Sequence, residues 1–181
     1  MQDESAYRIG DRILFGAAYY PEYQPVERMA EDFRLMREAG FNLIRVGESV
    51  WSTWEPRDGE FELEWLLPVL DAAHAHGISV VLGTPTYAVP PWLMLKHPEI
   101  AAESRTGVRV PWGARQETDT SHPVFLDYAE RIIRKVVGRY ADHPAVVGFQ
   151  VDNEPGHQVP HNAHVFARFK QWLMAKYNGV E

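Results

Sequence analysis

Cysteine is absent from this 181-residue sequence, and several kinds of chemistry are excluded with it. Without thiols the chain has no disulfide framework, no thiolate nucleophile and no cysteine-ligated zinc site. Long apolar runs are also missing, since no segment approaches the roughly 18 apolar residues that a membrane helix needs. The first 12 residues, MQDESAYRIGDR, lack the apolar core of a signal peptide. We therefore expect a cytoplasmic protein that has no membrane partner.

Positive charge is scarce as well. Lys and Arg number 18 against 25 Asp and Glu, which gives a net charge of −7, and the basic residues form no run. Because nucleic-acid binding relies on clustered Lys and Arg, we expect no nucleic-acid partner. Apolar residues are 45% of the chain and aromatic residues 12%, with six Trp. This composition predicts one globular domain whose tryptophans pack a core or line a sugar site.

Three segments share a pattern in which a helix ends and a short apolar strand begins. They are residues 38–47 (EAGFNLIRVG), 75–84 (AHGISVVLGT) and 141–150 (ADHPAVVGFQ). In the first two, Gly40 and Gly77 suit the left-handed residue that often ends a helix. In the third, Pro144 ends the helix because it cannot continue the hydrogen-bond ladder. An opening strand is expected over about residues 12–18.

Apolar residues at helical spacing precede or follow these strands. Helices are predicted over residues 25–39, 62–76, 121–140 and about 161–178, with Ser121 as an N-cap and Pro123 in a first turn. Strands that are apolar throughout are typical of a parallel sheet covered on both faces. The order strand–helix, four times over, therefore predicts an α/β fold with a parallel sheet.

The loops that follow the strands are long and rich in aromatic residues and proline, whereas the loops that precede them are short. This asymmetry is typical of a parallel TIM-type barrel, whose strand-end loops build the site. A full (β/α)8 barrel takes about 250 residues. We therefore interpret residues 1–181 as the first half of such a barrel, with about four of the eight units and two unpaired edge strands.

Polar residues stand where the predicted strands end, and in a parallel barrel these positions face the site. They are Tyr19, Tyr20, Arg45, Glu48, Thr84, Thr86, Asp152, Asn153 and Glu154. A carboxyl group at a strand end among aromatic residues, as at Glu154, can act as a proton donor. Asn153 offers a donor and an acceptor for a substrate hydroxyl. The alternative is a solvated loop in which these residues form a turn and a helix cap.

Asn153-Glu154 after the fourth strand resembles the acid/base signature of a large clan of (β/α)8 glycosidases. Four longer stretches together resemble glycoside hydrolase family 42, the β-galactosidases, from about residue 15 to the last helix. They are FGAAYYPEYQP, GFNLIRVGESVWSTWEPRDGEFELEWL, LGTPTYAVPPWL and YADHPAVVGFQVDNEPG.

The resemblance implies retaining hydrolysis of terminal β-D-galactosides, without a cofactor, by two carboxyl groups. It implies that Glu154 is the general acid/base and that Asn153 binds the 2-hydroxyl of the sugar. The stretch WGARQETDTSHP resembles the region that holds a galactose-binding arginine, which points to Arg115. The alternative for Arg115 is a charge on a surface loop.

Two departures from the family pattern matter. The family's nucleophile is a glutamate at the end of the seventh strand, which lies outside this chain, so we expect the chain alone to be inactive. Some members carry a cysteine-ligated zinc near the Arg115 region, where this chain has Asp119, and we predict no metal there. The histidines of residues 157–164 (HQVPHNAH) are interrupted by Pro160, and we expect no metal site among them either.

Several roles stay open. Glu48 is a second site carboxylate or pairs with a basic residue such as Arg45. Trp51, Trp54 and Trp92 line a sugar pocket or pack the rim of the barrel. Asp152 has no assigned role.

The function has two alternatives beside a β-galactosidase. One is another retaining glycosidase of the clan, acting on mannans, glucans or arabinosides. The other is a non-catalytic half barrel that binds sugar or self-associates, as a homo-oligomer or by pairing with the missing barrel half.

Overall fold

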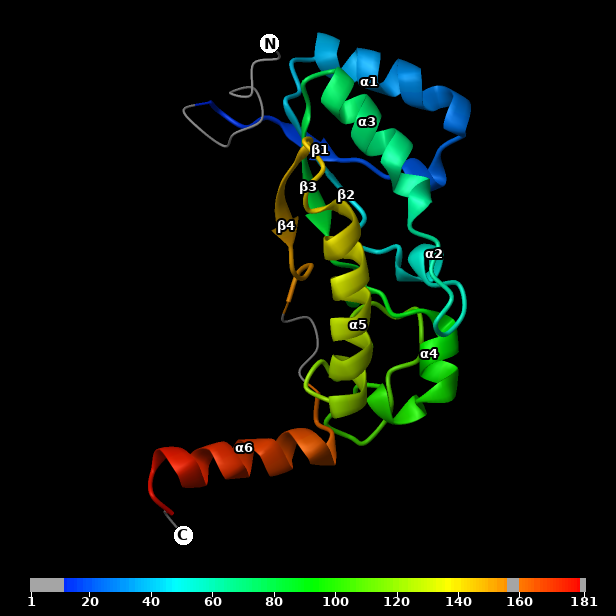
Figure 1. Cartoon of the computed structure of the whole chain (residues 1–181). Helices are drawn as coiled ribbons and strands as arrows, with labels where there is room; N and C mark the ends of the chain where they lie inside the picture. The colour runs from blue at the N-terminus through cyan, green and yellow to red at the C-terminus, as the bar shows by residue number, and fades with distance from the viewer. Residues whose placement is uncertain (1–11, 156–159, 180–181) are drawn as a thin grey trace.

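A parallel sheet of four strands organises the computed structural model, which describes residues 12–155 and 160–179 (Figure 1). The strands are β1 (Gly16–Ala18), β2 (Leu43–Val46), β3 (Ser79–Gly83) and β4 (Val146–Gln150). They lie in chain order, and every neighbouring pair is parallel. The predicted α/β class, in the arrangement of the first half of a TIM-type barrel, is confirmed.

Helices connect and cover these strands. Their bounds are α1 (Met29–Glu38), α2 (Trp51–Trp54), α3 (Leu67–Ala75), α4 (Pro91–Lys96), α5 (Pro123–Tyr140) and α6 (Ala163–Lys176). Two short 3-10 turns follow strands: η2 (Pro21–Tyr23) after β1 and η5 (Pro85–Tyr87) after β3. Each predicted helix is present, and the boundaries differ from the expected ones by a few residues.

The start of α5 corrects one prediction. The N-cap is His122, whose Nδ1 accepts a hydrogen bond from the Val124 backbone N–H at 3.3 Å, and Pro123 occupies the first turn as expected. Ser121, the expected cap, instead donates its hydroxyl to Asp119 Oδ1 at 2.7 Å. The cap therefore comes one residue later than expected, because the buried carboxylate of Asp119 accepts the Ser121 hydroxyl.

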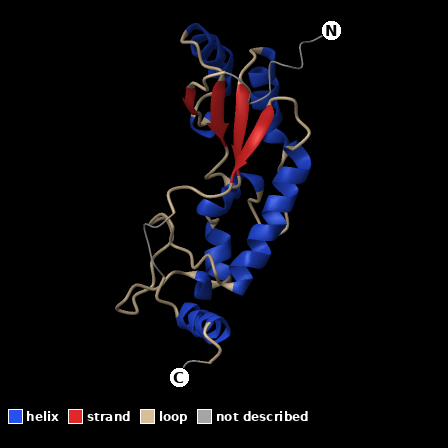
Figure 2. Ribbon diagram, turned by 90° about the vertical axis from the view of Figure 1, so that its left-hand side faces the viewer, coloured by secondary structure: helices blue, strands red, loops and turns tan. Residues whose placement is uncertain are grey.

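The core lies on one face of the sheet. Ile44 of β2 and Val80 of β3 are paired in register and almost fully buried, and they join Phe33 of α1, Leu70 of α3 and Ile132 of α5 in one apolar cluster. In Figure 2 the strands lie side by side as broad arrows, with helices behind and beside them. Alternation along the strands places Arg45 on the opposite face. We call these the helix face and the open face.

The two outer strands are less covered than the sequence led us to expect. All three residues of β1 are exposed, and β4 has no fully buried residue. Within the described residues, β1 pairs with β2 alone and β4 with β3 alone. A Cβ added to Gly148, in β4, would meet no atom within 4 Å. The expectation of strands covered on both faces is therefore wrong for β1 and β4.

Helix α6 lies apart from the sheet (Figure 1). It has no buried residue, and it contacts the start of α5 through His164 Nε2 and Arg168 Nη1, which lie 3.0 Å and 2.8 Å from the Ser121 carbonyl oxygen. None of the helices in the described part of the chain combines the length and apolarity that a bilayer crossing requires.

Candidate functional site

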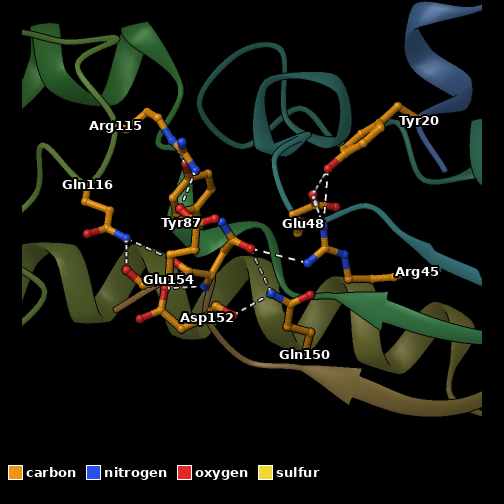
Figure 3. Close-up of polar contacts among 10 residues, drawn as sticks. Tyr20, Arg45, Glu48, Tyr87, Arg115, Gln116, Gln150, Asp152 and Glu154 are labelled. Atoms are coloured by element: carbon orange, nitrogen blue, oxygen red, sulfur yellow. Dashed lines mark hydrogen bonds and ion pairs between the residues drawn. The ribbon is translucent and has the colours of Figure 1, made fainter. Parts of the chain in front are cut away.

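Polar side chains from separate strand ends meet on the open face (Figure 3). Arg45 comes from β2, Gln150 from β4 and Tyr87 from η5, while Arg115 comes from the long loop before α5. The three residues that the sequence singles out, Arg115, Asn153 and Glu154, lie together here. Parallel strands bring this about, because their carboxyl ends share one edge of the sheet.

A buried cluster forms one side of the site. Glu48 is 5% exposed, and its Oε1 accepts hydrogen bonds from the Tyr20 hydroxyl at 2.7 Å and from Arg45 Nη2 at 2.9 Å. The hydrogen bond to Glu48, together with burial, raises the pKa of Tyr20 above its usual value. The expectation that Glu48 pairs with Arg45 is confirmed. We call Tyr20, Arg45 and Glu48 the buried cluster.

Asn153 joins this cluster to the end of β4. Its Oδ1 accepts hydrogen bonds from Arg45 Nη1 at 3.3 Å and from Gln150 Nε2 at 3.2 Å. Both partners donate, so the side-chain oxygen faces them, and among the described residues no partner takes the two amide hydrogens. Asp152 Oδ1 accepts the backbone N–H of Asn153 at 2.7 Å. Asp152 therefore shapes the turn that presents Asn153.

Glu154 stands on the other side of the site and is exposed. Its Oε2 accepts a hydrogen bond from Arg115 Nη2 at 2.8 Å, across 39 positions of sequence. Arg115 also donates through Nε to the Tyr87 hydroxyl, and its guanidinium carbon lies 5.5 Å from the centre of the Tyr87 ring. The hydrogen bond to Tyr87, and to a smaller extent the pairing with Glu154, raises the pKa of Arg115. We call Tyr87, Arg115 and Glu154 the exposed cluster.

The backbone is strained at this exposed cluster. Arg115, Gln116 and Glu154 have φ angles of 61°, 51° and 50°, in the left-handed region that side chains rarely adopt. Gln116 Nε2 donates to the carbonyl oxygens of Asn153, at 2.8 Å, and of Glu154, so it ties the two strained segments together. Such conformations cost roughly 1–3 kcal/mol each and gather at functional sites.

Sequence reasoning missed three contributors: Tyr87, Gln116 and Gln150. Gln150 is the last residue of β4, and its polar side chain at a strand end was a readable signal. Tyr87 and Gln116 are placed by loop conformation, for which the sequence offered no signal. Of the strand-end threonines, Thr84 is buried and donates its hydroxyl to the Val151 carbonyl oxygen at 3.1 Å, so it secures the end of β4.

The tryptophans pack and do not line this site. Trp51 and Trp54 are fully buried, and Trp51 Nε1 donates to Glu55 Oε2 at 3.0 Å. Trp92 is partly buried against the core and donates to the Glu55 carbonyl oxygen at 2.8 Å. The packing alternative therefore holds for all three residues.

No group of three or more metal-ligating side chains is found among residues 12–155 and 160–179. His157, one of the histidines weighed as a ligand, lies outside the described residues. Asp119 is fully buried, and its Oδ1 accepts hydrogen bonds from the backbone N–H and the hydroxyl of Ser121 at 2.9 Å and 2.7 Å. This carboxylate therefore fastens the loop that leads into α5.

Known proteins resemble the chain over almost its whole length. A family model described as "Beta-galactosidase" (Glyco_hydro_42) matches residues 18–181. The β-galactosidase of Thermus thermophilus is 41% identical over 177 residues, which cover 93% of this chain and 26% of that protein.

Solved structures agree. The β-galactosidase of the psychrophilic Marinomonas ef1 superposes with a TM-score of 0.88 at 37% identity and covers 92% of this chain. A catalytic mutant of a GH42 β-galactosidase from G. stearothermophilus gives 0.89 at 33% identity and covers 95%. The chain spans about a quarter of the length of these proteins, 26% and 25% respectively.

Proposed function

Since the chain belongs to glycoside hydrolase family 42, the β-galactosidase family, we propose that it supplies the acid/base half of a retaining β-galactosidase. Residues 1–181 are then the N-terminal half of a (β/α)8 catalytic domain that takes terminal β-D-galactosides and needs no cofactor. The observation that carries this proposal is the meeting of two distant segments at the site: Arg115 bonds to Glu154 (Figure 3), and the adjacent Gln116 donates to the Asn153 carbonyl oxygen.

Glu154 is the general acid/base of this proposal. It protonates the glycosidic oxygen as the bond to the leaving group breaks, and later takes a proton from the attacking water. Glu154 Oε2 accepts a hydrogen bond from Arg115 Nη2 at 2.8 Å, so this bond has to be exchanged before the carboxyl group approaches the glycosidic oxygen. Sugar hydroxyls that draw the donors of Arg115 to themselves release Glu154 for the first step. Arg115 therefore serves as a galactose-binding residue, and its binding to the sugar leaves Glu154 free to act as the acid.

Asn153 forms a hydrogen bond with the 2-hydroxyl of the sugar. Arg45 and Gln150 occupy its side-chain oxygen, at 3.3 Å and 3.2 Å, so its amide hydrogens are directed to the substrate. A hydrogen bond to the 2-hydroxyl that tightens in the transition state supplies part of the rate enhancement. Asn153 is thus held by the buried cluster while it contacts the ligand.

The nucleophile belongs to the part of the family's barrel that this chain does not include. Retaining glycosidases place their two carboxyl groups about 5–5.5 Å apart. Glu48, the buried carboxylate of the site, is held by Arg45 and Tyr20. We expect the 181-residue chain alone not to hydrolyse β-galactosides.

A chimera tests the proposal. This chain replaces the matching quarter of the Thermus thermophilus relative, and the chimera is assayed on lactose and on an activated aryl β-galactoside. Glu154→Gln should lower kcat/KM on lactose by about 10²–10⁴-fold, the usual contribution of acid/base catalysis. It should have a smaller effect on the activated substrate, whose leaving group departs without a proton.

Glu130→Gln is the matched control, because Glu130 is an exposed glutamate on α5 whose side chain pairs with Arg134. It should leave both rates unchanged. Equal losses on the two substrates in Glu154→Gln would contradict the acid/base assignment. Hydrolysis by the isolated chain, lost on Glu154→Gln, would show instead that a carboxylate in this half completes the pair.

The substrate class has one competitor. The Asn153-Glu154 pair is common to the clan, so a mannan-, glucan- or arabinoside-cleaving enzyme shares this signature. A panel of aryl glycosides given to the same chimera separates these activities. Strong turnover of another glycoside beside negligible turnover of the β-galactoside would reject the β-galactosidase assignment.

A further inference from the structure

Asn162 is a buried polar residue outside the two clusters of the site. It is 5% exposed and stands at the N-cap position of α6, yet among the described residues its side chain caps no N–H of that helix. Its Nδ2 donates to the Ala101 carbonyl oxygen at 2.8 Å, and its Oδ1 accepts the Glu103 N–H at 2.8 Å. Asparagine is a preferred N-cap because its oxygen can accept a helix N–H. Here the side chain instead holds a distant extended segment.

That segment, residues 100–103, also holds the loop before α5, and we call it the anchor segment. The Ile100 carbonyl oxygen accepts the Asp119 N–H at 2.8 Å. The Ala102 N–H donates to the Glu117 carbonyl oxygen at 2.7 Å. All four residues are less than 5% exposed, so these bonds are shielded from water. The anchor segment therefore fixes the part of the loop that directly follows Arg115 and Gln116.

Both loops of the exposed cluster are in this way fastened to one place. Arg115 Nη2 lies 2.8 Å from Glu154 Oε2, and Gln116 Nε2 lies 2.8 Å from the Asn153 carbonyl oxygen. On the other loop, Asn162 follows Glu154 by eight positions, from 154 to 162. The chain that carries Glu154 and the chain that carries Arg115 thus meet twice, once at the site and once at the anchor segment.

Backbone strain makes such fastening necessary. Arg115, Gln116 and Glu154 have left-handed φ angles, which persist only where the surroundings over-determine them. The bonds from the anchor segment to the Arg115 loop are made by backbone groups, whereas Asn162 supplies two bonds through its side chain. A single substitution can therefore release the Glu154 side and leave the Arg115 side in place.

We propose that Asn162 is a positioning residue that, through the anchor segment, sets the place of Glu154 relative to Arg115. This inference rests on the proposed function, because it concerns the step in which Glu154 protonates the glycosidic oxygen. Asn162 acts through the backbone and not by contact with the sugar. Its loss leaves the Glu103 N–H and the Ala101 carbonyl without these partners. A displacement of about 1 Å at a catalytic group can lower a rate about 10²-fold.

Asn162→Ala in the chimera tests the proposal. It should lower kcat/KM on lactose at least tenfold more than on the activated aryl β-galactoside, because only lactose needs the proton of a well-placed Glu154. Both substrates carry the same galactose, so the ratio of the two rates isolates the acid step from sugar binding. An unchanged ratio in a folded variant would overturn the proposal.

Asn42→Ala is the matched control. Asn42 directly precedes β2, at the end of the sheet opposite to the strand ends that carry the site. Its side chain makes the same two kinds of bond, from Nδ2 to the Ile13 carbonyl oxygen at 2.9 Å and from the Phe15 N–H to Oδ1 at 2.8 Å. The control should leave the ratio of the two rates unchanged. An equal fall of this ratio in Asn42→Ala would mean that loosening the fold anywhere is enough, and would overturn the proposal.

A double-mutant cycle separates positioning from general damage. In the Glu154→Gln background, Asn162→Ala should lower the rate on lactose less than twofold further, because the group that Asn162 positions is already lost. Losses that multiply fully would show that Asn162 acts independently of Glu154, and would overturn the proposal.

Asn162→Asp keeps the test decisive should the alanine variant fail to fold. It has nearly the same shape and keeps an oxygen for the Glu103 N–H, but it loses the donor to the Ala101 carbonyl at pH 7. The lactose-to-aryl ratio should fall in this variant too. A selective loss on lactose in Glu154→Gln beside an unchanged ratio in Asn162→Asp would overturn the positioning role and leave the proposed function standing. Equal losses on both substrates in Glu154→Gln would instead reject the proposed function itself.

Discussion

The two sides of the site hold similar ion pairs in opposite surroundings. Arg45 and Glu48 meet at 2.9 Å, with side chains 30% and 6% exposed. Arg115 and Glu154 meet at 2.8 Å, with side chains 60% and 55% exposed. The two ion pairs have nearly equal distances but contribute differently to stability, because a buried charge depends on its partner whereas an exposed charge is also solvated by water.

This difference assigns different tasks to the two clusters. Arg45 of the buried cluster donates to the side-chain oxygen of Asn153, and this cluster has little freedom to exchange partners. In the proposed function, the exposed cluster exchanges a protein partner for a sugar hydroxyl, and the exposure of both side chains makes that exchange inexpensive. The same substitution made at Arg45 and at Arg115 should therefore affect stability to different degrees.

The largest expected effect is on stability. Arg45→Met leaves the buried carboxylate of Glu48 without its cation and should lower the free energy of unfolding by about 2–4 kcal/mol, below the fully buried limit because Arg45 is partly exposed. Arg115→Met should cost less than about 1 kcal/mol. Urea unfolding followed by circular dichroism measures both. Equal costs would mean that burial does not distinguish the two pairs.

A double substitution sharpens this result. Arg45→Met/Glu48→Met removes both charges, so it should recover much of the stability that Arg45→Met loses. A double variant less stable than either single one would show that the pair itself, and not the cost of an unpaired charge, stabilises the fold.

The next effect is on ligand affinity. In the chimera, Arg115→Ala should raise KM for a β-galactoside about tenfold or more, since a hydrogen bond to a charged group contributes roughly 1.5–3 kcal/mol. Its melting temperature should stay near that of the unsubstituted chimera. Arg134→Ala, which removes an exposed α5 charge paired with Glu130, is the control and should alter neither quantity. An unchanged KM in Arg115→Ala would remove Arg115 from the sugar site.

The smallest effect concerns pH. Burial raises the pKa of Glu22, which lies near the buried cluster, and the charge of Glu48 adds to the rise. A raised pKa means that Glu22 favours the folded state below pH 4.5, its ordinary value, and that this contribution is lost as pH rises through the folded pKa.

Glu22→Gln should therefore be more stable than wild type at pH 7, by less than about 1 kcal/mol after solvent screening, and the gain should shrink toward pH 4. Glu27→Gln, at an exposed residue of the same segment, is the control. Chemical unfolding at both pH values measures the difference. A gain that grows as pH falls would reverse the sign and contradict the burial argument.

Much of the fold could be predicted because its signals are local. Glycines at helix ends, Pro144 and apolar strands set the order of strands and helices, and the structure has that order. The pairing of Glu48 with Arg45 was also accessible, since the two residues are three positions apart at one strand end. Ser121 failed as an N-cap because Asp119, a buried carboxylate two positions earlier in the sequence, accepts its hydroxyl.

The candidate site was accessible in part. Asn153 and Glu154 end an apolar strand, a position that in a parallel sheet faces the site. Gln116 was not accessible, because it lies in a loop that turns through left-handed conformations at residues other than glycine. Tyr87 was not accessible either, because the 3-10 turn η5 after β3 places it. Arg, Gln and Glu do not predict a left-handed backbone conformation from the sequence.

The amino-acid order alone therefore accounts for the α/β class, the parallel strands and the strand-end position of Asn153 and Glu154, since each follows from contacts between near neighbours. Tertiary structure decided that Glu48 is buried while Glu154 is exposed, and that Arg115 meets Glu154. These features depend on which distant segments come together, and hydrophobic patterning along the chain does not record that.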